Sequence, residues 1–397
     1  MASLVPFRAL RVSASAAARV AAVPYDVVTT EEARALASQD PLSFLHVSRP
    51  EVDLPPDTDP HAPAVYAAAA SRFERLKQDA PFERDETPAL YVYRLRMGTH
   101  EQSGVAGAYS LDEYDRDVIR KHERTRRDKE DDRTQHMLAL GAQTGPVFLT
   151  YRASADIDGV VSRVSARGPV IDFEAADGVR HTIWRVSSDD GGALAAGFGR
   201  VPALYIADGH HRAASAARLR QTHRCDRFLA VAFPDNQVRI LPYNRTVANL
   251  NGLSREAFLD AVRARFEVSA GGPSPAVKGD ISMYLSGRWS TLRARGDSAA
   301  GDAIGGLDVS VLQERLLDPV LGMHDVRTDP RIEFVGGARG TQALERTVDA
   351  GRAAVAFSLF PVGVSDLMAI ADAGQVMPPK STWFEPKLRD GLLIHEL

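Results

Sequence analysis

The pattern of apolar and polar positions predicts short buried strands in alternation with helices. Residues 204–207 form an apolar run after Pro202, and the strong helix formers of residues 213–219 come next. The apolar runs 147–151 and 228–233 are also typical of buried strands. Strands that alternate with helices along the chain indicate a mixed α/β fold.

The same patterning predicts elements outside these runs. Hydroxyls followed by acids at residues 29–32 are typical of a helix start, and a second helix is expected over residues 64–78. Alternation in residues 89–95 predicts a strand with one buried face and one exposed face. Short strands with turns are expected over residues 160–186, and residues 286–288 lie at the turn of a predicted hairpin.

The length of 397 residues suggests two or three domains, on a prior of about 100–200 residues each. Regular alternation of strands and helices ends near residues 234–241, where we expect a boundary. We therefore predict a catalytic region over residues 1–238 that carries a charged helical insertion. Residues 239–397 are predicted to form a C-terminal α+β region that closes the site.

Composition excludes several classes of protein. A net charge of -4 and a pI near 6.3 give no overall attraction to nucleic acid or to an anionic membrane. No segment offers the ~20 apolar residues that a membrane span needs. The single cysteine, Cys225, excludes an intrachain disulfide framework and a cysteine-rich zinc site. These features predict a soluble cytoplasmic protein and leave its oligomeric state open.

The richest chemical signal lies where the apolar run 204–207 ends. An acid, a glycine, two imidazoles and a guanidinium follow in sequence as Asp208, Gly209, His210, His211 and Arg212. A turn from a strand into a helix offers free backbone N–H groups and a favourable helix dipole to an anion such as phosphate. Asp208 could instead be an N-cap, but capping alone does not explain the three residues after Gly209. The cluster therefore favours an active or ligand-binding site over a structural turn.

Other site types fit the sequence less well. Asp208, His210 and His211 could contribute to a metal site, but adjacent histidines generally point in different directions, so a dedicated zinc ion is not expected and the metal stays unknown. A Ser-His-Asp triad cannot be inferred, because the sequence has no Gly-x-Ser-x-Gly elbow.

The charged segment 116–136 predicts a cationic stripe if it is helical. Spacings of 4, 3, 4 and 3 residues would place five side chains on one face. These are His122, Arg126, Lys129, Arg133 and His136. Beside them, Glu123 and Arg127 would form an i,i+4 pair, and the opposite side would hold Asp128, Asp131 and Asp132. The stripe is either a solvated face or a surface for an anion, such as a nucleotide, a phosphorylated substrate or an acidic part of the same protein.

A second candidate phosphate or magnesium site follows two prolines near the C-terminal end of the sequence. Lys380, Ser381 and Thr382 combine a cation with two hydroxyls. The segment lacks the glycine-rich loop of a Walker A motif, so it does not predict a P-loop. Trp383 and Phe384 could cover a ring, or the whole segment could be a strap packed over the domain.

Several ordered motifs resemble one known family. They are Pro6–Leu10, Val23–Val28, Ser43–Val47, Lys121–Arg133, Ala207–Arg212, Leu241–Arg245 and Met377–Pro386. Together these motifs span nearly the whole chain and resemble the bacterial and archaeal family labelled domain of unknown function 1015. Within it, the Asp-Gly-His-His-Arg segment resembles the strand, turn and helix of the ParB/sulfiredoxin superfamily, particularly the free-serine kinases.

The resemblance implies a ParB/sulfiredoxin-like mixed α/β core with an additional C-terminal α+β region. It also implies ATP or ADP with Mg²⁺ as cofactors, and serine or phosphoserine as the substrate. Gly209 and Arg212 would contact phosphate, while Asp208 and one of His210 or His211 would act near the reacting hydroxyl. Sulfinic acid reduction is not expected, because the segment has no cysteine.

These observations lead to the hypothesis of a nucleotide-dependent phosphotransferase acting on serine or phosphoserine, in the kinase or the phosphatase direction. Phosphoryl transfer needs mainly positioning and charge neutralisation. The proposed phosphate- or nucleotide-binding residues are Gly209, Arg212, His122, Arg126, Lys129, Arg133, Lys380, Ser381 and Thr382. Asp26 and Glu123 are alternatives to Asp208 for orienting the hydroxyl or holding Mg²⁺. Two other functions stay open. One is a ParB-like nucleotide-dependent protein that binds DNA or a partner, although the acidic pI makes nucleic acid a poor candidate. The other is a metal-dependent phosphatase.

Overall fold

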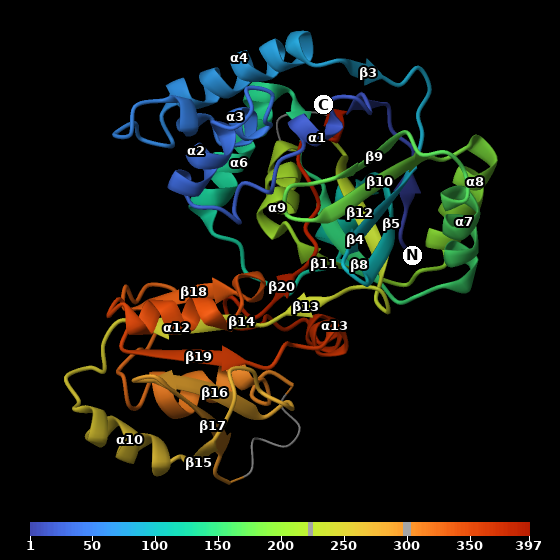
Figure 1. The fold of residues 1–397 in the computed structure, drawn as a ribbon. Coiled ribbons are helices and arrows are strands. Elements are labelled where there is room, and N and C mark those ends of the chain that lie inside the picture. Colours follow the sequence, from blue (N-terminus) through green and yellow to red (C-terminus); the bar gives the residue numbers. More distant parts are fainter. Residues whose placement is uncertain (221–224, 297–302) are drawn as a thin grey trace. The chain divides into compact units, whose positions relative to one another are not determined.

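The computed structural model describes the whole chain except residues 221–224 and 297–302. Its described residues divide into two compact units. One unit comprises residues 1–238 together with 386–397, and the other comprises residues 239–385 (Figure 1). Both units contain helices and strands, which confirms the mixed α/β class predicted from the sequence.

A mixed sheet forms the centre of the first unit. Its strand order is β6-β11-β8-β12-β5-β4-β10-β9, and β1 pairs with β5. β12 runs parallel to β8, while β11 runs antiparallel to it. The strands are β1 (Leu4–Val5), β4 (Tyr91–Met97), β5 (His100–Ser110), β6 (Ile119–Arg120), β8 (Val147–Tyr151), β9 (Ile171–Glu174), β10 (Val179–Arg185), β11 (Leu204–Asp208) and β12 (Arg227–Pro234).

Strand β4 differs from its prediction. It lies between β5 and β10, so neighbouring strands cover both of its edges. Tyr91, Val92 and Tyr93 are consecutive and all buried. The expected exposed face is therefore wrong for the first half of this strand, because both faces are covered by other parts of the unit.

Helices pack around this sheet. α6 packs against α9 and α7 packs against α8, and in Figure 1 the strands run between these two helix pairs. The helices are α1 (Ala17–Val20), α2 (Thr30–Ala37), α3 (Leu45–Ser48), α4 (Pro63–Asp79), α5 (Leu111–Asp115), α6 (Arg127–Leu140), α7 (Ala155–Ser165), α8 (Ser188–Phe198) and α9 (His210–Leu219), with a 3-10 turn at Pro50–Asp53. Helix α7 corrects the expectation of strands from residue 160, because Ile157, Val160, Val161 and Val164 bury one helical face.

Helix α2 begins as its sequence predicts. Thr29 accepts a hydrogen bond from the backbone N–H of Glu32, and the Glu32 side chain accepts one from the N–H of Thr29. This capping box satisfies two N–H groups that would otherwise lack partners at the helix start.

A smaller sheet brings the last residues of the chain into the first unit. Its order is β3-β2-β21-β7. The strands are β2 (Ala9–Val12), β3 (Phe82–Arg84), β7 (Ala142–Gln143) and β21 (Leu393–Glu396). Residues 386–397, grouped with the C-terminal region on sequence alone, thus belong to the first unit.

The second unit is built on an antiparallel sheet with the order β15-β17-β16-β19-β14-β18. Its strands are β13 (Ile240–Leu241), β14 (Tyr243–Val247), β15 (Phe266–Ala270), β16 (Asp280–Leu285), β17 (Arg288–Ala294), β18 (Ile332–Gly336), β19 (Val355–Leu359) and β20 (Trp383–Phe384). Its helices are α10 (Arg255–Arg263), α11 (Asp308–Leu312), α12 (Thr341–Asp349) and α13 (Val364–Asp372), with short helical turns at Gln313–Leu317 and Gly337–Arg339. The predicted hairpin is confirmed, with Ser286 and Gly287 both at positive φ between β16 and β17. In the described residues of both units, no helix combines the length and the apolar character that crossing a membrane requires.

Candidate active site

The turn after β11 has the geometry that the sequence predicts. The strand ends at Asp208, and Gly209 is the N-cap of α9 with φ 89 and ψ 29. This left-handed conformation favours glycine. A Cβ at this position would also lie 3.0 Å from Cζ of Arg212. Because Gly209 has no side chain to accept their hydrogen bonds, the N–H groups of the first helical turn can bind an anion. The alternative role of Asp208 as the N-cap is therefore wrong.

Asp208 is held between two cations. Its Oδ1 accepts a hydrogen bond from Nζ of Lys387 at 3.0 Å, and its Oδ2 accepts one from Nη2 of Arg212 at 2.8 Å. Burial raises the pKa of Asp208, but the charges of Lys387 and Arg212 outweigh burial and hold this pKa well below its usual value. The carboxylate is therefore ionised at any physiological pH.

The side chain of Arg212 is buried beneath the turn. It is 6% exposed, and its Nη1 donates to the carbonyl oxygen of Pro146 at 2.5 Å. Nε is buried and has no hydrogen-bond partner among the described residues. The guanidinium thus fixes Asp208 and the turn, and it keeps one donor unused.

His210 and His211 both hold the segment 121–126 against α9. Nε2 of His211 accepts a hydrogen bond from the backbone N–H of Arg126 at 3.1 Å. Nε2 of His210 faces the backbone N–H of His122 at 3.5 Å, the outer limit of a hydrogen bond. Its Nδ1 lies 3.9 Å from a carboxylate oxygen of Glu123. Burial lowers the pKa of His210 to about 3, so this ring is neutral at pH 7.

His122 is buried beside His210. The two rings meet edge to face with centroids 4.5 Å apart. Neither ring nitrogen of His122 makes a hydrogen bond of good geometry with the described residues. Burial, with a smaller contribution from His210, holds the pKa of His122 well below its usual value. A weak contact with the backbone of Ile206 opposes this shift, so the imidazole keeps one polar neighbour.

The predicted cationic stripe is only partly helical. Helix α6 begins at Arg127, Arg126 is its N-cap in an extended conformation, and His122 precedes the helix. His122 and Arg126 therefore do not share a helical face with the other three side chains, and the expected i,i+4 pair of Glu123 with Arg127 is not formed on a helix. The cause is contact with distant parts of the chain, since Ile119 and Arg120 pair with β11 and the histidines of α9 hold the chain that follows.

The remaining members of the stripe mostly serve internal contacts. Nη1 of Arg133 donates to the carbonyl of Ser48 at 3.2 Å, and Nε2 of His136 bonds to the carbonyl of Val47 at 2.8 Å. Lys129 is half-buried. Asp132, expected on the opposite side, is buried and pairs with Arg133 at 2.8 Å. Arg133 is thus neutralised by its sequence neighbour, and an anion-binding role for the stripe stays a prediction.

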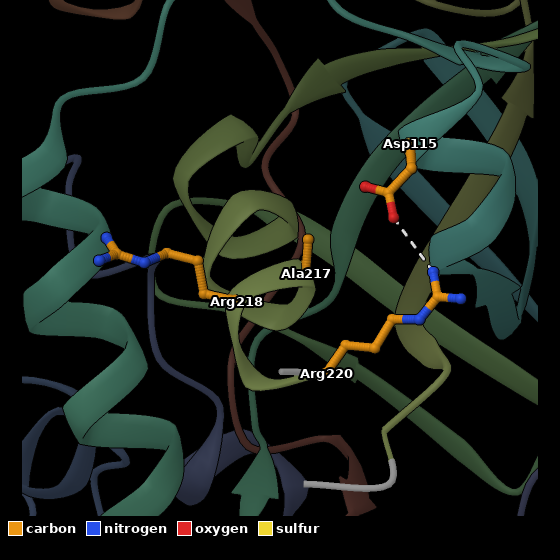
Figure 2. A pocket seen from close by; sticks show the side chains of 4 residues that line it. All are labelled: Asp115, Ala217, Arg218 and Arg220. Carbon is orange, nitrogen blue, oxygen red and sulfur yellow. Dashed lines mark hydrogen bonds and ion pairs between the residues drawn. The ribbon is translucent and has the colours of Figure 1, made fainter. Parts of the chain in front are cut away.

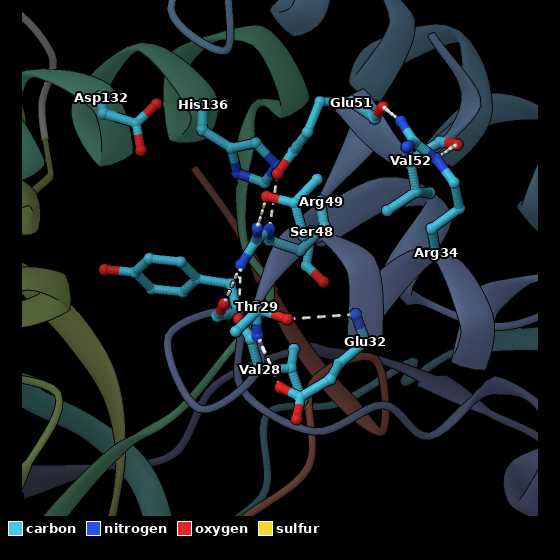
Figure 3. A network of polar contacts seen from close by, with 12 residues as sticks. Val28, Thr29, Glu32, Arg34, Ser48, Arg49, Glu51, Val52, Asp132 and His136 are labelled. Carbon is cyan, nitrogen blue, oxygen red and sulfur yellow. Dashed lines mark hydrogen bonds and ion pairs between the residues drawn. The ribbon is translucent and has the colours of Figure 1, made fainter. Parts of the chain in front are cut away.

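Arg49 organises the loop that precedes α2. Its Nη1 donates to the carbonyls of Tyr25 at 2.6 Å and Val28 at 2.9 Å, and its Nε pairs with Glu51 at 2.6 Å. Figure 3 shows this network beside His136. The guanidinium of Arg133 stacks over the Tyr25 ring at 4.2 Å. These contacts fix the backbone on both sides of Asp26, whose charge acts on Arg212.

Asp390 is a candidate site residue that the sequence did not reveal. It is 4% exposed, and its Oδ1 has no hydrogen-bond partner among the described residues. Burial raises the pKa of Asp390 to about 7, against the opposing charge of Arg212. A Cβ on Gly145 would collide with this carboxyl, so a larger residue there would have to displace the Asp390 side chain. Asp390 and Lys387 lie far along the chain from Asp208, and only the return of residues 386–397 to the first unit brings them together.

The comparisons with known proteins identify the family. The model of the family described as "Protein of unknown function (DUF1015)" matches residues 4–310. The chain belongs to this family. No curated protein matches it. Thus the DUF1015 family is established for most of the chain, and it brings no assigned activity.

Solved structures resemble this DUF1015 protein at low identity. A conserved hypothetical protein from Pyrococcus furiosus is 16% identical, with a TM-score of 0.36 over 72% of this chain and 93% of the other. A free serine kinase in complex with AMP is 14% identical, with a TM-score of 0.38 over 73% and 92%. SbnI with a C-terminal truncation, from Staphylococcus aureus, is 12% identical, with a TM-score of 0.41 over 72% and 85%.

Lys380, Ser381 and Thr382 belong to the second unit of the DUF1015 protein. Lys380 has a positive φ of 55, and its carbonyl accepts a hydrogen bond from the buried Arg245 at 2.9 Å. Oγ of Ser381 donates to the carbonyl of Pro378 at 2.6 Å. These contacts shape the turn itself, and a phosphate-binding role for its side chains stays a prediction.

A hollow of about 370 Å³ lies at the other end of α9. It is lined by Asp115, Ala217, Arg218 and Arg220 (Figure 2). Arg220 pairs with Asp115 at 3.1 Å, and Arg218 pairs with Glu130 at 3.2 Å. Its cations are neutralised, and the C-terminal end of a helix disfavours anions. The N-terminal end of α9 is therefore a better candidate for an anion site than this hollow. The described residues also contain no cluster of three or more His, Cys, Asp or Glu side chains arranged for a metal ion.

Replacement of Gly209 by alanine is expected to destabilise the first unit by about 1–2 kcal/mol from the left-handed backbone alone, and by more because the methyl group meets Arg212 at 3.0 Å. Urea denaturation measures the change in the free energy of unfolding. Gly178→Ala is the matched control, since Gly178 has φ 77 and open space around a Cβ. Equal losses in the two variants would contradict the contact with Arg212.

Proposed function

We propose that this DUF1015 protein is a nucleotide-dependent phosphotransferase that acts on serine or phosphoserine at the turn 208–212. One observation carries the proposal: an ionised, largely buried carboxylate, Asp208, immediately precedes a helix whose N-cap is a glycine. The helix start favours a phosphate group, and the carboxylate beside it can orient the hydroxyl that attacks or leaves the phosphorus.

Each part of the site has a role in this proposal. The first turn of α9 binds the transferred phosphoryl group, and Asp208 accepts the proton of the serine hydroxyl. The hydroxyl oxygen forms the new bond to phosphorus, and the bond from phosphorus to the leaving nucleoside phosphate breaks. His210 and His211 hold the segment 121–126 beside the helix start as positioning residues, because both rings already contact its backbone.

Magnesium fits the site only together with the nucleotide. Mg²⁺ is commonly bound by one or two carboxylates and by substrate phosphates. Asp208 or Asp26 could supply the carboxylate, and the described residues provide no larger cluster. The ion would neutralise charge on the transferred group. Serine is supported by the resemblance of the Asp208–Arg212 segment to the free-serine kinases.

Phosphorus NMR on the purified protein tests the proposal. Serine is supplied with ATP or ADP, and phosphoserine with ADP or AMP, each with and without Mg²⁺. The expected result is a new phosphoserine or nucleotide signal in at least one mixture. No movement of phosphate in any mixture would refute the proposal. Hydrolysis of phosphoserine that needs metal but no nucleotide would instead identify a phosphatase, and salt-dependent binding to duplex DNA without turnover would identify a ParB-like binding protein.

A further inference from the structure

Three half-buried aromatic residues gather in the second unit, and we refer to them as the aromatic cluster. The Tyr243 ring meets the Phe334 ring edge to face with centroids 6.2 Å apart, and it meets the Trp383 ring in the same way at 5.3 Å. A Cβ on Gly336 would lie 2.6 Å from the Trp383 ring, so this ring lies directly on the backbone of β18. Aromatic rings that stay partly exposed in one group offer a surface on which a planar ligand can stack.

An exposed cation lies beside this cluster. Nζ of Lys380 is 5.5 Å from the centre of the Tyr243 ring. The backbone of Lys380 has a φ of 55, in the left-handed region that a residue with a side chain rarely adopts. Such a conformation costs free energy and persists where the surrounding structure enforces it. The turn is therefore held in a costly conformation that places Lys380 next to the aromatic cluster.

Arg245 enforces the conformation of this turn. It is 2% exposed, and its Nη2 donates to the carbonyl oxygen of Lys380 at 2.9 Å. Nη1 donates to the carbonyl oxygen of Tyr243, and the guanidinium lies over the Phe334 ring at 5.2 Å. One buried side chain thus ties the turn that carries Lys380 to two members of the aromatic cluster.

No acid neutralises the charge of Arg245 among the described residues. Its hydrogen bonds go to backbone carbonyls, and no carboxylate is among the groups that act on its pKa. Burial lowers this pKa to about 9, so the guanidinium still carries its charge at pH 7. The neighbouring acid Glu385 accepts a hydrogen bond from Nε1 of Trp383 at 2.8 Å. An uncompensated buried cation next to an exposed lysine makes this surface attractive to an anion.

We propose that the second unit carries a binding site for a nucleoside phosphate, with the base packed against the aromatic cluster and the phosphate bound by Lys380. The ligand must combine a planar ring with an anion, because the surface combines exposed aromatic rings with cations. Arg245 is a positioning residue, since it holds the turn and adds positive charge without reaching the surface. The site goes beyond the proposed function, because all of its residues lie within 239–385 and none belongs to the turn 208–212.

Titration of the full-length protein with ADP, followed by tryptophan fluorescence, tests the position of the ring. Trp383 is one of three tryptophans in the chain. A base that packs against the aromatic cluster is expected to quench Trp383. The quenching should be lost in Trp383→Phe, whereas Trp289→Phe should keep it, because Trp289 bonds to Glu345 and lies outside the cluster.

Lys380→Met tests the phosphate contact. The substitution is expected to weaken ADP binding at this site by about 10- to 100-fold, the loss of one hydrogen bond between charged groups. Lys380→Arg should retain most of the affinity, because it keeps a cation. The matched control is Lys278→Met, which removes a lysine paired with Asp366 at 2.9 Å in the same unit and should leave ADP binding unchanged.

Tyr243→Leu separates the ring contact from the phosphate contact. Loss of stacking should weaken ADP and adenosine binding by about 5- to 100-fold, while Tyr243→Phe keeps the ring and most of the affinity. Inorganic pyrophosphate has no ring, so its affinity should respond to Lys380→Met and not to Tyr243→Leu. A cluster that is only structural predicts no such difference between the ligands.

Two results would overturn this site: no quenching of Trp383 by ADP, or an ADP affinity that stays at the wild-type value in both Lys380→Met and Tyr243→Leu. Failure of the proposed function looks different. In that case ADP still quenches Trp383, but phosphorus NMR shows no transfer between nucleotide and serine.

Discussion

Asp208→Asn is expected to lower the rate of phosphoryl transfer by about 100- to 10,000-fold, the range for loss of a general acid–base group. The amide keeps the size of the side chain but cannot accept the proton of the serine hydroxyl. Turnover is measured by following phosphoserine formation under saturating nucleotide and serine.

Asp190→Asn provides the control for this experiment. Asp190 is 6% exposed and pairs with Arg163 at 2.8 Å and Arg167 at 2.7 Å. It is thus a second carboxylate of the first unit held between two cations, distant from the turn after β11. The substitution should lower stability and leave turnover near the wild-type value. Asp208→Asn with full turnover, or equal losses of turnover in both variants, would contradict a special role for Asp208.

Asp390→Asn is expected to raise the free energy of unfolding at pH 8 by up to about 4 kcal/mol, at about 1.4 kcal/mol for each unit of pKa shift. Burial raises the pKa of Asp390 from 3.8 to about 7 in the folded protein. The folded state therefore binds the proton more tightly than the unfolded state between pH 4 and 7. Over this window, stability falls as the pH rises. Above pH 7 the folded protein bears the full cost of a buried charge, which asparagine removes.

Urea denaturation of the wild type and the variant at pH 4 and pH 8 measures the effect. The two proteins should differ little at pH 4, where the carboxyl is protonated in nearly all folded molecules and the pH lies close to the pKa of the unfolded state. The groups whose charges act on Asp390 are Arg212, Asp26, Arg133 and Arg389. A difference between the two proteins that is the same at both pH values would show that ionisation of Asp390 is not the cause. Asp112→Asn, at an exposed carboxylate, serves as the control for the substitution itself.

The local part of the site could be predicted from the sequence. An apolar strand, a glycine that permits positive φ and a run of helix formers specify the turn from β11 into α9 without help from distant residues. The capping box of α2 is local in the same way. Both predictions hold because the deciding contacts join residues that are within a few positions of each other.

The sequence predictions that failed did so because contacts with distant residues decide the structure there. Residues 121–126 have a helix-compatible charge pattern, but the backbone of Arg126 donates to His211, a residue far along the chain, and α6 begins only at Arg127. Lys387 and Asp390 carry no signal of their own in the sequence. Their roles depend on residues 386–397 returning to the first unit, and no periodicity of charged or apolar residues encodes that return.

The first unit is built from two separate segments of the chain, and this has a consequence for its synthesis. Strand β21 lies between β2 and β7, and the segment before it supplies Lys387 and Asp390. All of residues 239–385 must be translated before these pieces exist. At about 5–20 residues per second, this imposes a delay of roughly 7–30 s. During that interval the edge of β2 that later pairs with β21 is unpaired on the ribosome. A chaperone that recognises open strand edges could bind the nascent chain at this stage.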